Sequence, residues 1–252
     1  MIRVLRIALL LSLSLAVPAS AQSPEARIAV AANFGKLAQR LAGDYEALSG
    51  HHLDISLGST GKLYAQIRQG APFDVFLAAD RTTPQRLLDE GLAVADSLHD
   101  YAIGRLVLLS GHEGIGRADE QLLRERNFRT FAIANPRLAP YGVAAREVLA
   151  HVNRLAELEP RFVLGENIAQ ATQYITTGNA DAGLVPWSLA LELPTTSSTS
   201  WWLIPADWHA PIVQSAVLLN RAENNAAARG FLAYLQSADA LRIITSHGYD
   251  QP

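Results

Sequence analysis

Short apolar runs alternate with helix-type patterns along most of the chain. The run RIAVAA (27–32) is followed by a segment in which Leu37, Leu41 and Tyr45 recur at helical spacing, and DVFLAA (74–79) precedes another such segment. Buried strands that alternate with amphipathic helices are typical of α/β domains. The pattern therefore predicts an α/β fold with mostly parallel strands flanked by helices.

Two longer apolar strands are expected near residues 101–110 and 211–220, on either side of a middle block with the same alternation. This arrangement predicts two lobes, because the chain can cross into a second lobe at one strand and return at the other. We expect lobe I to comprise residues 22–102 and 213–252, and lobe II to comprise residues 103–212.

The N-terminal residues have the pattern of a secretory signal peptide. Arg3 and Arg6 precede an apolar run at 7–17, and Ala19 and Ala21 then form the A-x-A pattern of a cleavage site. The run is too short to span a bilayer. We expect residues 1–21 to be removed after Ala21. Because the chain has no cysteine for a disulfide or a lipid anchor, we expect a freely diffusing, monomeric periplasmic protein.

The charge balance argues against binding to nucleic acid. The formal net charge is −3, and removal of Arg3 and Arg6 leaves 19 basic against 24 acidic residues, a charge of −5. A net-acidic protein binds nucleic acids and anionic membranes poorly. Any anion that this chain binds must therefore be held by local dipoles.

Four turns share a feature that suits such an anion. In each, small or polar residues stand where a strand ends and a helix begins, and helix N-termini attract anions. In open parallel sheets, ligands bind beyond the carboxyl ends of the strands. The four turns could therefore converge on one cleft, with Asn33 and Thr60 as side-chain donors; the alternative is ordinary helix capping. The turns are Ala32 and Asn33, Ser59 and Thr60, Pro140 and Tyr141, and Asn167 and Ile168.

The second turn, GSTGK, is not a nucleotide-binding loop. The P-loop motif needs Gly five residues before Gly61 and Ser or Thr after the lysine. Here Ser56 and Leu63 occupy those positions.

Several stretches resemble the periplasmic molybdate-binding proteins of ABC transporters. The resemblance extends along the mature chain and implies a two-lobed periplasmic-binding-protein fold that closes on molybdate or tungstate and delivers it to an inner-membrane permease. It implies no cofactor, no direct coordination of the metal by the protein and no enzymatic activity. The stretches are VAANF, GSTGKLYAQIRQGAPFDVFLAAD, YAIGRLVLLS, IANPRLAPYG, NADAGLVPWS and FLAYLQSADALRIITSHGY.

The resemblance also implies a ligand set. The family's polar ligand in the first turn corresponds to Asn33 and its hydroxyl ligand in the second to Thr60, with Ser59 beside it. Its backbone donors in the second lobe correspond to Tyr141 and Ile168.

This chain departs from the family pattern at two positions. Some members have a tyrosine where this chain has Pro186, and others have a threonine where it has Ala32. Ser59, the phenol of Tyr141 or the indole of Trp187 could compensate for the lost hydroxyl.

The same sequence also bears on other possible functions. A hydrolase is disfavoured, because the chain has no G-x-S-x-G elbow, no H-E-x-x-H helix and no thiol. His51 and His52 are expected at the solvated end of a helix, and Asp80 and Asp181 at structural caps or strand edges. Sulfate remains an alternative ligand. Phosphate would require an acceptor such as Glu166, and ferric iron would require several tyrosines or carboxylates.

Overall fold

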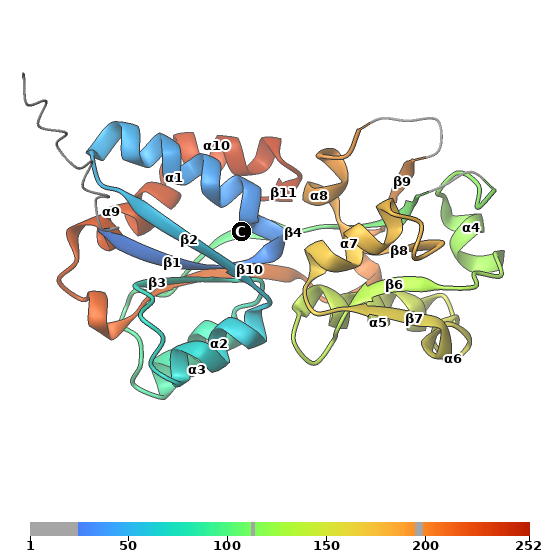
Figure 1. Cartoon of the computed structure of the whole chain (residues 1–252), viewed down its shortest axis with the longest axis horizontal. Helices are drawn as coiled ribbons and strands as arrows, with labels where there is room; N and C mark the ends of the chain where they lie inside the picture. Colours follow the sequence, from blue (N-terminus) through green and yellow to red (C-terminus); the bar gives the residue numbers. More distant parts are fainter. Residues whose placement is uncertain (1–24, 112–113, 195–198) are drawn as a thin grey trace, which may run out of the picture.

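The molecule consists of two lobes lying side by side (Figure 1). It was analysed as a computed structural model that describes residues 25–111, 114–194 and 199–252, so the expected signal peptide at 1–21 lies outside the described residues. Within those ranges lobe I has a six-stranded sheet in the order β11-β4-β10-β3-β1-β2, and lobe II has a five-stranded sheet in the order β7-β6-β8-β5-β9. In the described part of the chain, no helix has the length and apolar character needed to cross a membrane.

Lobe I combines segments from both ends of the described chain. Its strands are β1 (Ala26–Ala31), β2 (Leu53–Gly58), β3 (Val75–Ala78), β4 (His99–Gly104), β10 (Ile212–Leu218) and β11 (Tyr249–Asp250). Its helices are η1 (Ala32–Phe34), α1 (Gly35–Ser49), α2 (Thr60–Arg68), α3 (Thr82–Asp89), η4 (Asn220–Ala222), α9 (Ala226–Leu235) and α10 (Ala238–Ser246).

Lobe II is built from the middle of the chain. Its strands are β5 (Leu106–Ser110), β6 (Phe131–Ala134), β7 (Phe162–Gly165), β8 (Ala182–Pro186) and β9 (Ser200–Leu203). Its helices are α4 (Glu120–Glu125), α5 (Pro140–His151), α6 (Leu155–Leu158), η2 (Glu159–Arg161), α7 (Ile168–Thr176), α8 (Trp187–Leu191) and η3 (Ala206–Trp208).

Both sheets are mixed, so the α/β fold class is confirmed but the expectation of mostly parallel sheets is wrong. In lobe I, β1 runs parallel to β2 and β3, whereas β10 runs antiparallel to β3 and β4. In lobe II, β6 runs parallel to β7 and β8, whereas β5 runs antiparallel to β8 and β9. The parallel pairs are joined through crossover helices, which parallel strands require. β5 and β10, the strands that follow the two crossings between lobes, run opposite to the parallel strands of their sheets, whereas β4 and β9, which precede the crossings, run in the same direction as those strands.

The chain passes between the lobes twice. β4 ends at Gly104 in the first sheet and β5 begins at Leu106 in the second, so the single long strand expected at 101–110 is two strands separated by Arg105. The chain returns between β9, which ends at Leu203, and β10, which begins at Ile212. These two connections place lobe II within the sequence of lobe I.

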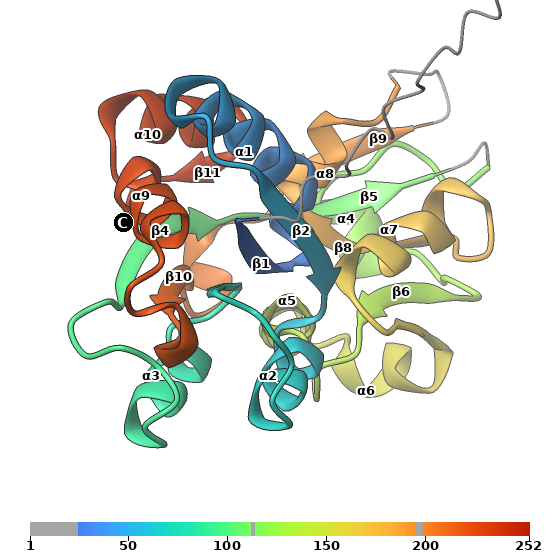
Figure 2. The ribbon, with the colours of Figure 1, turned by 60° about the vertical axis from the view of Figure 1, so that its left-hand side comes forward.

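Each sheet is covered by helices on both faces, which gives each lobe two apolar cores. In lobe I, α1, α9 and α10 cover one face and α2 and α3 the other (Figure 2). In lobe II, α5 packs on one face, and α7 and α8 contribute to a second core on the other. This packing fixes the helix starts relative to the strand ends that precede them.

Candidate functional site

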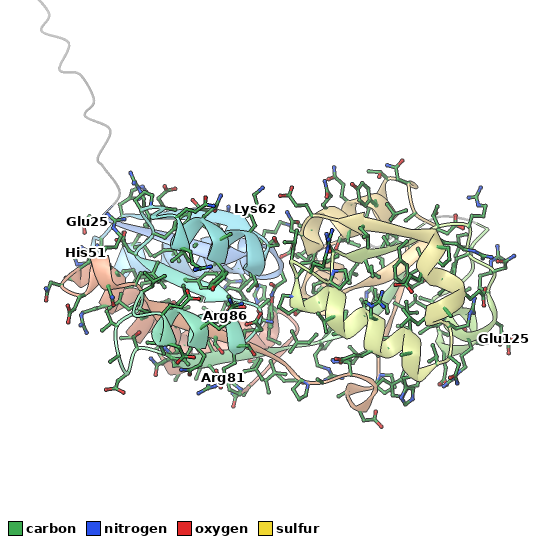
Figure 3. The ribbon with its side chains drawn as sticks, turned by 90° about the horizontal axis from the view of Figure 1, so that it is seen from below. Glu25, His51, Lys62, Arg81, Arg86 and Glu125 are labelled. Atoms are coloured by element: carbon green, nitrogen blue, oxygen red, sulfur yellow. The ribbon has the colours of Figure 1, made fainter. Side chains whose placement is uncertain are left out.

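The four helix starts expected from the sequence converge where the lobes meet. The start of α2 reaches lobe II through the N–H of Gly61, which donates to the carbonyl of Leu138, just before α5, at 2.9 Å. The next residue, Lys62, lies at the junction of the lobes (Figure 3). Its Nζ pairs at 2.5 Å with Oε1 of Glu166, a residue just before α7. The helix α7 also contacts η1. These contacts place η1, α2, α5 and α7 around one point.

The main-chain N–H groups at these starts are suited to donate to an anion. Thr60 and Ile168 are the first residues of α2 and α7, and Tyr141 follows Pro140 at the start of α5. The first N–H groups of a helix have no acceptor within that helix, and they form its positive dipole end. Because proline has no N–H, Tyr141 is the first residue of α5 that can donate.

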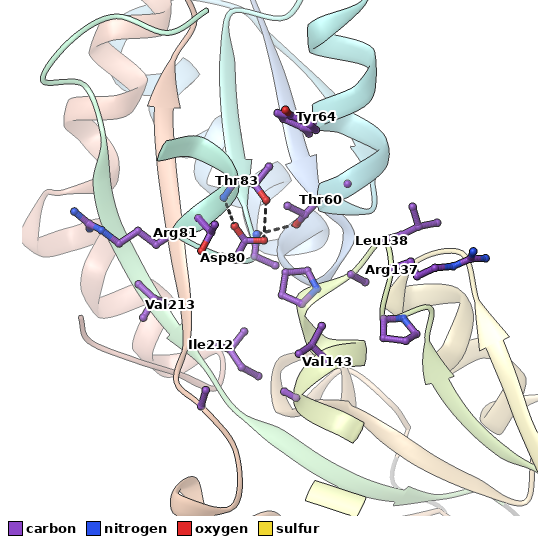
Figure 4. Close-up of a pocket in the computed structure, with 18 of the residues that line it drawn as sticks. Thr60, Tyr64, Asp80, Arg81, Thr83, Arg137, Leu138, Val143, Ile212 and Val213 are labelled. Atoms are coloured by element: carbon purple, nitrogen blue, oxygen red, sulfur yellow. Dashed lines mark hydrogen bonds between the residues drawn. The ribbon is translucent and has the colours of Figure 1, made fainter. Parts of the chain in front are cut away.

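Two hydroxyl groups lie at the start of α2. Ser59 is 3% exposed, and its Oγ has no hydrogen-bond partner among the residues that the structure describes. Thr60 is 2% exposed, and its Oγ1 accepts the N–H of Ala79 at 3.0 Å (Figure 4). Since that hydroxyl already accepts, its own proton remains to be donated. A buried hydroxyl without a partner is costly, so Ser59 fits a ligand that accepts hydrogen bonds.

Asn33 does not cap a helix, so the alternative of ordinary helix capping is wrong for this residue. It lies within η1, the N-cap position of α1 is Phe34, and the Asn33 side chain makes no capping hydrogen bond. Instead its Nδ2 donates to Gln214 Oε1 at 2.8 Å and to the Tyr249 hydroxyl at 3.1 Å. Both amide hydrogens are thus directed at groups of lobe I. The sequence carried no signal for these partners, which lie 181 and 216 residues away.

Of the three groups considered as replacements for the hydroxyl lost at Pro186, Ser59 is the one next to Thr60 at the start of α2, and its buried hydroxyl has no partner among the described residues. The buried phenol of Tyr141 has no partner within the described ranges, and it lies at the crossing between lobes, where a Cβ added to Gly104 would be 2.1 Å from its oxygen. Burial raises the pKa of Tyr141, so its phenol stays neutral. The indole of Trp187 packs on the lobe II core, 6.1 Å from the ring of Trp201.

The carboxylates and histidines weighed for catalysis have structural partners. Asp80, which precedes the N-cap residue of α3, accepts the N–H and hydroxyl of Thr83 in the first turn of that helix (Figure 4). Asp181 lies in the other lobe and pairs with Arg129 at 2.8 Å. Burial raises the pKa of Asp80. Burial of Asp181 acts in the same direction, but its hydrogen bonds with Arg129 and the charge of that residue outweigh it and lower the pKa.

The adjacent histidines serve separate carboxylates. His51 pairs with Glu25 at the end of lobe I far from lobe II (Figure 3), and His52 pairs with Glu46 at 3.0 Å. The described residues include no group of three or more His, Cys, Asp or Glu side chains that could hold a metal ion. The geometry therefore favours binding through neutral donors over catalysis or metal coordination.

A cavity of 620 Å³ adjoins the helix starts (Figure 4). Its wall includes Thr60 from α2, Val143 from α5 and Ile212 from β10, so both lobes and a connecting strand line it. Side chains of both charges border it, namely Asp80, Arg81, Arg86, Arg137 and Glu147. Of the five residues expected to bind the anion, Thr60 is the one that lines this cavity, so the cavity lies beside the helix starts and does not enclose them.

Comparison with known proteins agrees with this geometry. The molybdate-binding protein ModA of Azotobacter vinelandii is 41% identical over 230 residues, covering 91% of each chain. That of Rhodobacter capsulatus is 40% identical over 243 residues, covering 96% of this chain and 94% of the relative. The solved structure of the periplasmic molybdate-binding protein of Azotobacter vinelandii matches with a TM-score of 0.83 at 35% identity, covering 90% of this chain and 99% of that one.

A more distant structure has the same architecture. The sulfate-binding protein SubI of Mycobacterium tuberculosis matches with a TM-score of 0.72 at 14% identity, covering 89% of this chain and 85% of that one, which shows a shared fold alone. Together with the Azotobacter structure it confirms the two-lobed binding-protein fold. The family model of the bacterial extracellular solute-binding proteins matches residues 26–250. This chain therefore belongs to that family, whose members bind solutes and are not enzymes.

Proposed function

We propose that this protein captures molybdate or tungstate between its lobes in the periplasm and delivers the anion to an inner-membrane ABC permease. Support comes from its membership of the solute-binding family and from the relatives named for molybdate binding, at about two-fifths identity over most of the chain. Export through a signal peptide cleaved after Ala21, and action as a monomer, belong to the same proposal.

One observation carries the proposal: among the helix starts that come together where the lobes meet, the start of α2 holds the buried hydroxyl of Ser59, which lacks a partner among the described protein groups. We assign ligand contacts to the hydroxyls of Ser59 and Thr60 and to the N–H groups of Thr60, Tyr141 and Ile168. At the fourth start we assign the ligand contact to the main-chain N–H of Asn33, because the hydrogens of its side-chain amide already have acceptors.

This donor set favours a fully deprotonated oxyanion. Glu166, which could have accepted the proton of hydrogen phosphate, pairs with Lys62. The charges of these two side chains offset one another, so the ion is held by neutral donors and helix dipoles. A ligand that carries its own proton could direct it only at the hydroxyl oxygen of Ser59 or Thr60, because the other assigned contacts are N–H groups that cannot accept and no carboxylate is among them. Such a ligand makes fewer charge-assisted hydrogen bonds, which costs binding free energy.

A thermal-shift panel tests the assignment. We expect molybdate and tungstate to raise the melting temperature, because a ligand that binds only the folded state stabilises it by mass action. Phosphate and ferric citrate should produce no shift. A phosphate shift equal to that of molybdate would contradict a donor-only site. A shift with sulfate and none with molybdate would assign the protein to sulfate.

A further inference from the structure

A buried hydrogen-bond network lies behind the helix starts and joins the two lobes. Its members are Asn33 of η1, Gln214 of β10, Tyr249 of β11 and Ser188 of α8. All four are nearly inaccessible to solvent, with exposed fractions between 0% and 7%. Buried polar groups in such networks polarise one another, so losing one bond affects the others.

Tyr249 is the centre of this network. Its phenol donates to the carbonyl of Asn33 at 2.9 Å and accepts from Asn33 Nδ2 at 3.1 Å and from Ser188 Oγ at 3.1 Å. A tyrosine hydroxyl has one proton to donate and two lone pairs to accept with, so these three bonds use its full capacity. Asn33 is thereby fixed through its side chain and its main chain.

The bond from Ser188 crosses between the lobes. Ser188 belongs to α8 of lobe II, whereas Asn33, Gln214 and Tyr249 belong to lobe I. The start of α8 also lies against the turn before β11, where a Cβ added to Gly248 would be 3.2 Å from the nitrogen of Ser188. The Ser188 hydroxyl also lies 3.4 Å from the carbonyl of Asn33, but its contact with Tyr249 is shorter and that carbonyl already accepts from Tyr249. The Ser188–Tyr249 bond therefore forms only while lobe II lies against lobe I.

We propose that Tyr249 is a positioning residue that couples lobe closure to the oxyanion site. The inference rests on the proposed function for the identity of the ligand. When the lobes close, Ser188 completes the hydrogen bonds of Tyr249, and Tyr249 then holds η1 at its place among the converging helix starts. This bond stabilises the closed form from behind the ligand. Its loss should speed release of the ligand and leave capture unchanged.

Tyr101 provides a matched control. Tyr101 and Tyr249 are 1% and 2% exposed, and both rings pack on Phe34, at 4.8 and 5.4 Å between centroids. The phenol of Tyr101 donates to the carbonyl of Ala78 at 3.2 Å, within lobe I. Replacing either tyrosine with phenylalanine removes one buried hydroxyl from the same core. Only the Tyr249 replacement removes a bond to lobe II.

The experiment compares Tyr249→Phe, Ser188→Ala, the double variant and Tyr101→Phe. Stopped-flow and calorimetry measure molybdate binding, and urea titration measures apo stability. We expect Tyr249→Phe to raise the dissociation rate about two- to ten-fold, the range for one neutral hydrogen bond, at an unchanged association rate. The double variant should match Tyr249→Phe, and Tyr101→Phe should keep the wild-type rate. Tyr249→Phe should lose more apo stability than Tyr101→Phe, because it also removes two hydrogen bonds with Asn33 within lobe I, and Ser188→Ala isolates the bond between the lobes.

Equal dissociation rates for Tyr101→Phe and Tyr249→Phe, or additive effects of Ser188→Ala and Tyr249→Phe, would overturn the coupling. If the wild-type protein binds none of the oxyanions in the panel, the proposed function fails, and the contact between Tyr249 and lobe II is tested in the ligand-free protein. Small-angle scattering should then give Tyr249→Phe a larger radius of gyration than both wild type and Tyr101→Phe. Equal radii would overturn the inference.

Discussion

The hydroxyl of Thr60 has two roles, and a substitution can remove the hydroxyl while it keeps the shape of the side chain. It accepts the N–H of Ala79 at 3.0 Å, and we assign its proton to the bound anion. Thr60→Val keeps the shape and removes the hydroxyl, and Thr60→Ser keeps the hydroxyl. A hydrogen bond to a charged group contributes about 1.5–3 kcal/mol, so Thr60→Val should weaken molybdate binding about ten- to 150-fold by calorimetry. Thr60→Ser should bind nearly as wild type, and wild-type affinity in Thr60→Val would reject the assignment.

Asn33 shows how far sequence reasoning reaches at the residue scale. An asparagine after a strand and before a helix predicts a cap, and its location at a helix start is as expected. The hydrogen bonds of its side chain could not be expected from the sequence, because Gln214 and Tyr249 approach Asn33 only through the tertiary fold. The location of Ser59 and Thr60 at a helix start is as expected, because it depends on a local turn. The choice of Ser59 over Trp187 as a replacement hydroxyl required the packing of lobe II.

At the scale of elements, the helix starts were predictable and the strand directions were not. Turn residues such as Ser59, Pro140 and Asn167 indicate where a helix begins, and α2, α5 and α7 begin at or next to them. Strand direction depends on which strands become neighbours. β10 lies between β3 and β4, far from both in sequence, and no periodicity in β10 specifies that it pairs antiparallel with them.

The last residue of β4 allows the lobes to approach. A Cβ added to Gly104 would lie 2.1 Å from the Tyr141 oxygen, closer than real contacts come, and 3.0 Å from Gln214 Nε2. Gly104→Ala should therefore push α5 away from β4 and weaken molybdate binding at least about ten-fold, since closure brings in the donors of lobe II, the N–H groups of Tyr141 and Ile168. Calorimetry measures the loss.

Gly43→Ala is the control for that substitution. Gly43 lies in α1, where an added Cβ meets nothing within 4 Å. This variant should keep wild-type affinity and gain about 0.5–1 kcal/mol of stability from helix propensity. Equal affinities for Gly104→Ala and Gly43→Ala would show that Tyr141 moves aside without cost.

Across the whole molecule, the contacts that join the lobes differ in how much they stabilise the closed form. The pairs Lys62–Glu166 and Lys36–Glu192 have largely exposed lysines, and exposed ion pairs contribute little. The bond from Ser188 to Tyr249 is buried and is therefore shielded from competing water, whereas the main-chain bond from Gly61 to Leu138 joins half-buried residues. Closure therefore depends mainly on the ligand and on the buried contact between Ser188 and Tyr249.

The two lobes should move about the connections at Arg105 and between Leu203 and Ile212. Because closure brings four helix starts onto one ion, molybdate should reduce the radius of gyration in small-angle scattering. Thr60→Val, at a molybdate concentration that saturates only the wild-type protein, should keep its ligand-free profile. Identical wild-type profiles with and without bound molybdate would show that the lobes do not move.

The interrupted sequence of lobe I also sets an order of folding. Lobe II is continuous in the chain, so it can fold as soon as its own residues are available. The sheet of lobe I cannot, because β10 stands between β3 and β4 and β11 forms its edge. Pairing of such distant segments is slow, since a long loop must close before any contact forms. A chain that emerges N-terminus first therefore holds β1 to β4 without their central partner until residues 212–252 arrive, and the oxyanion site is assembled last.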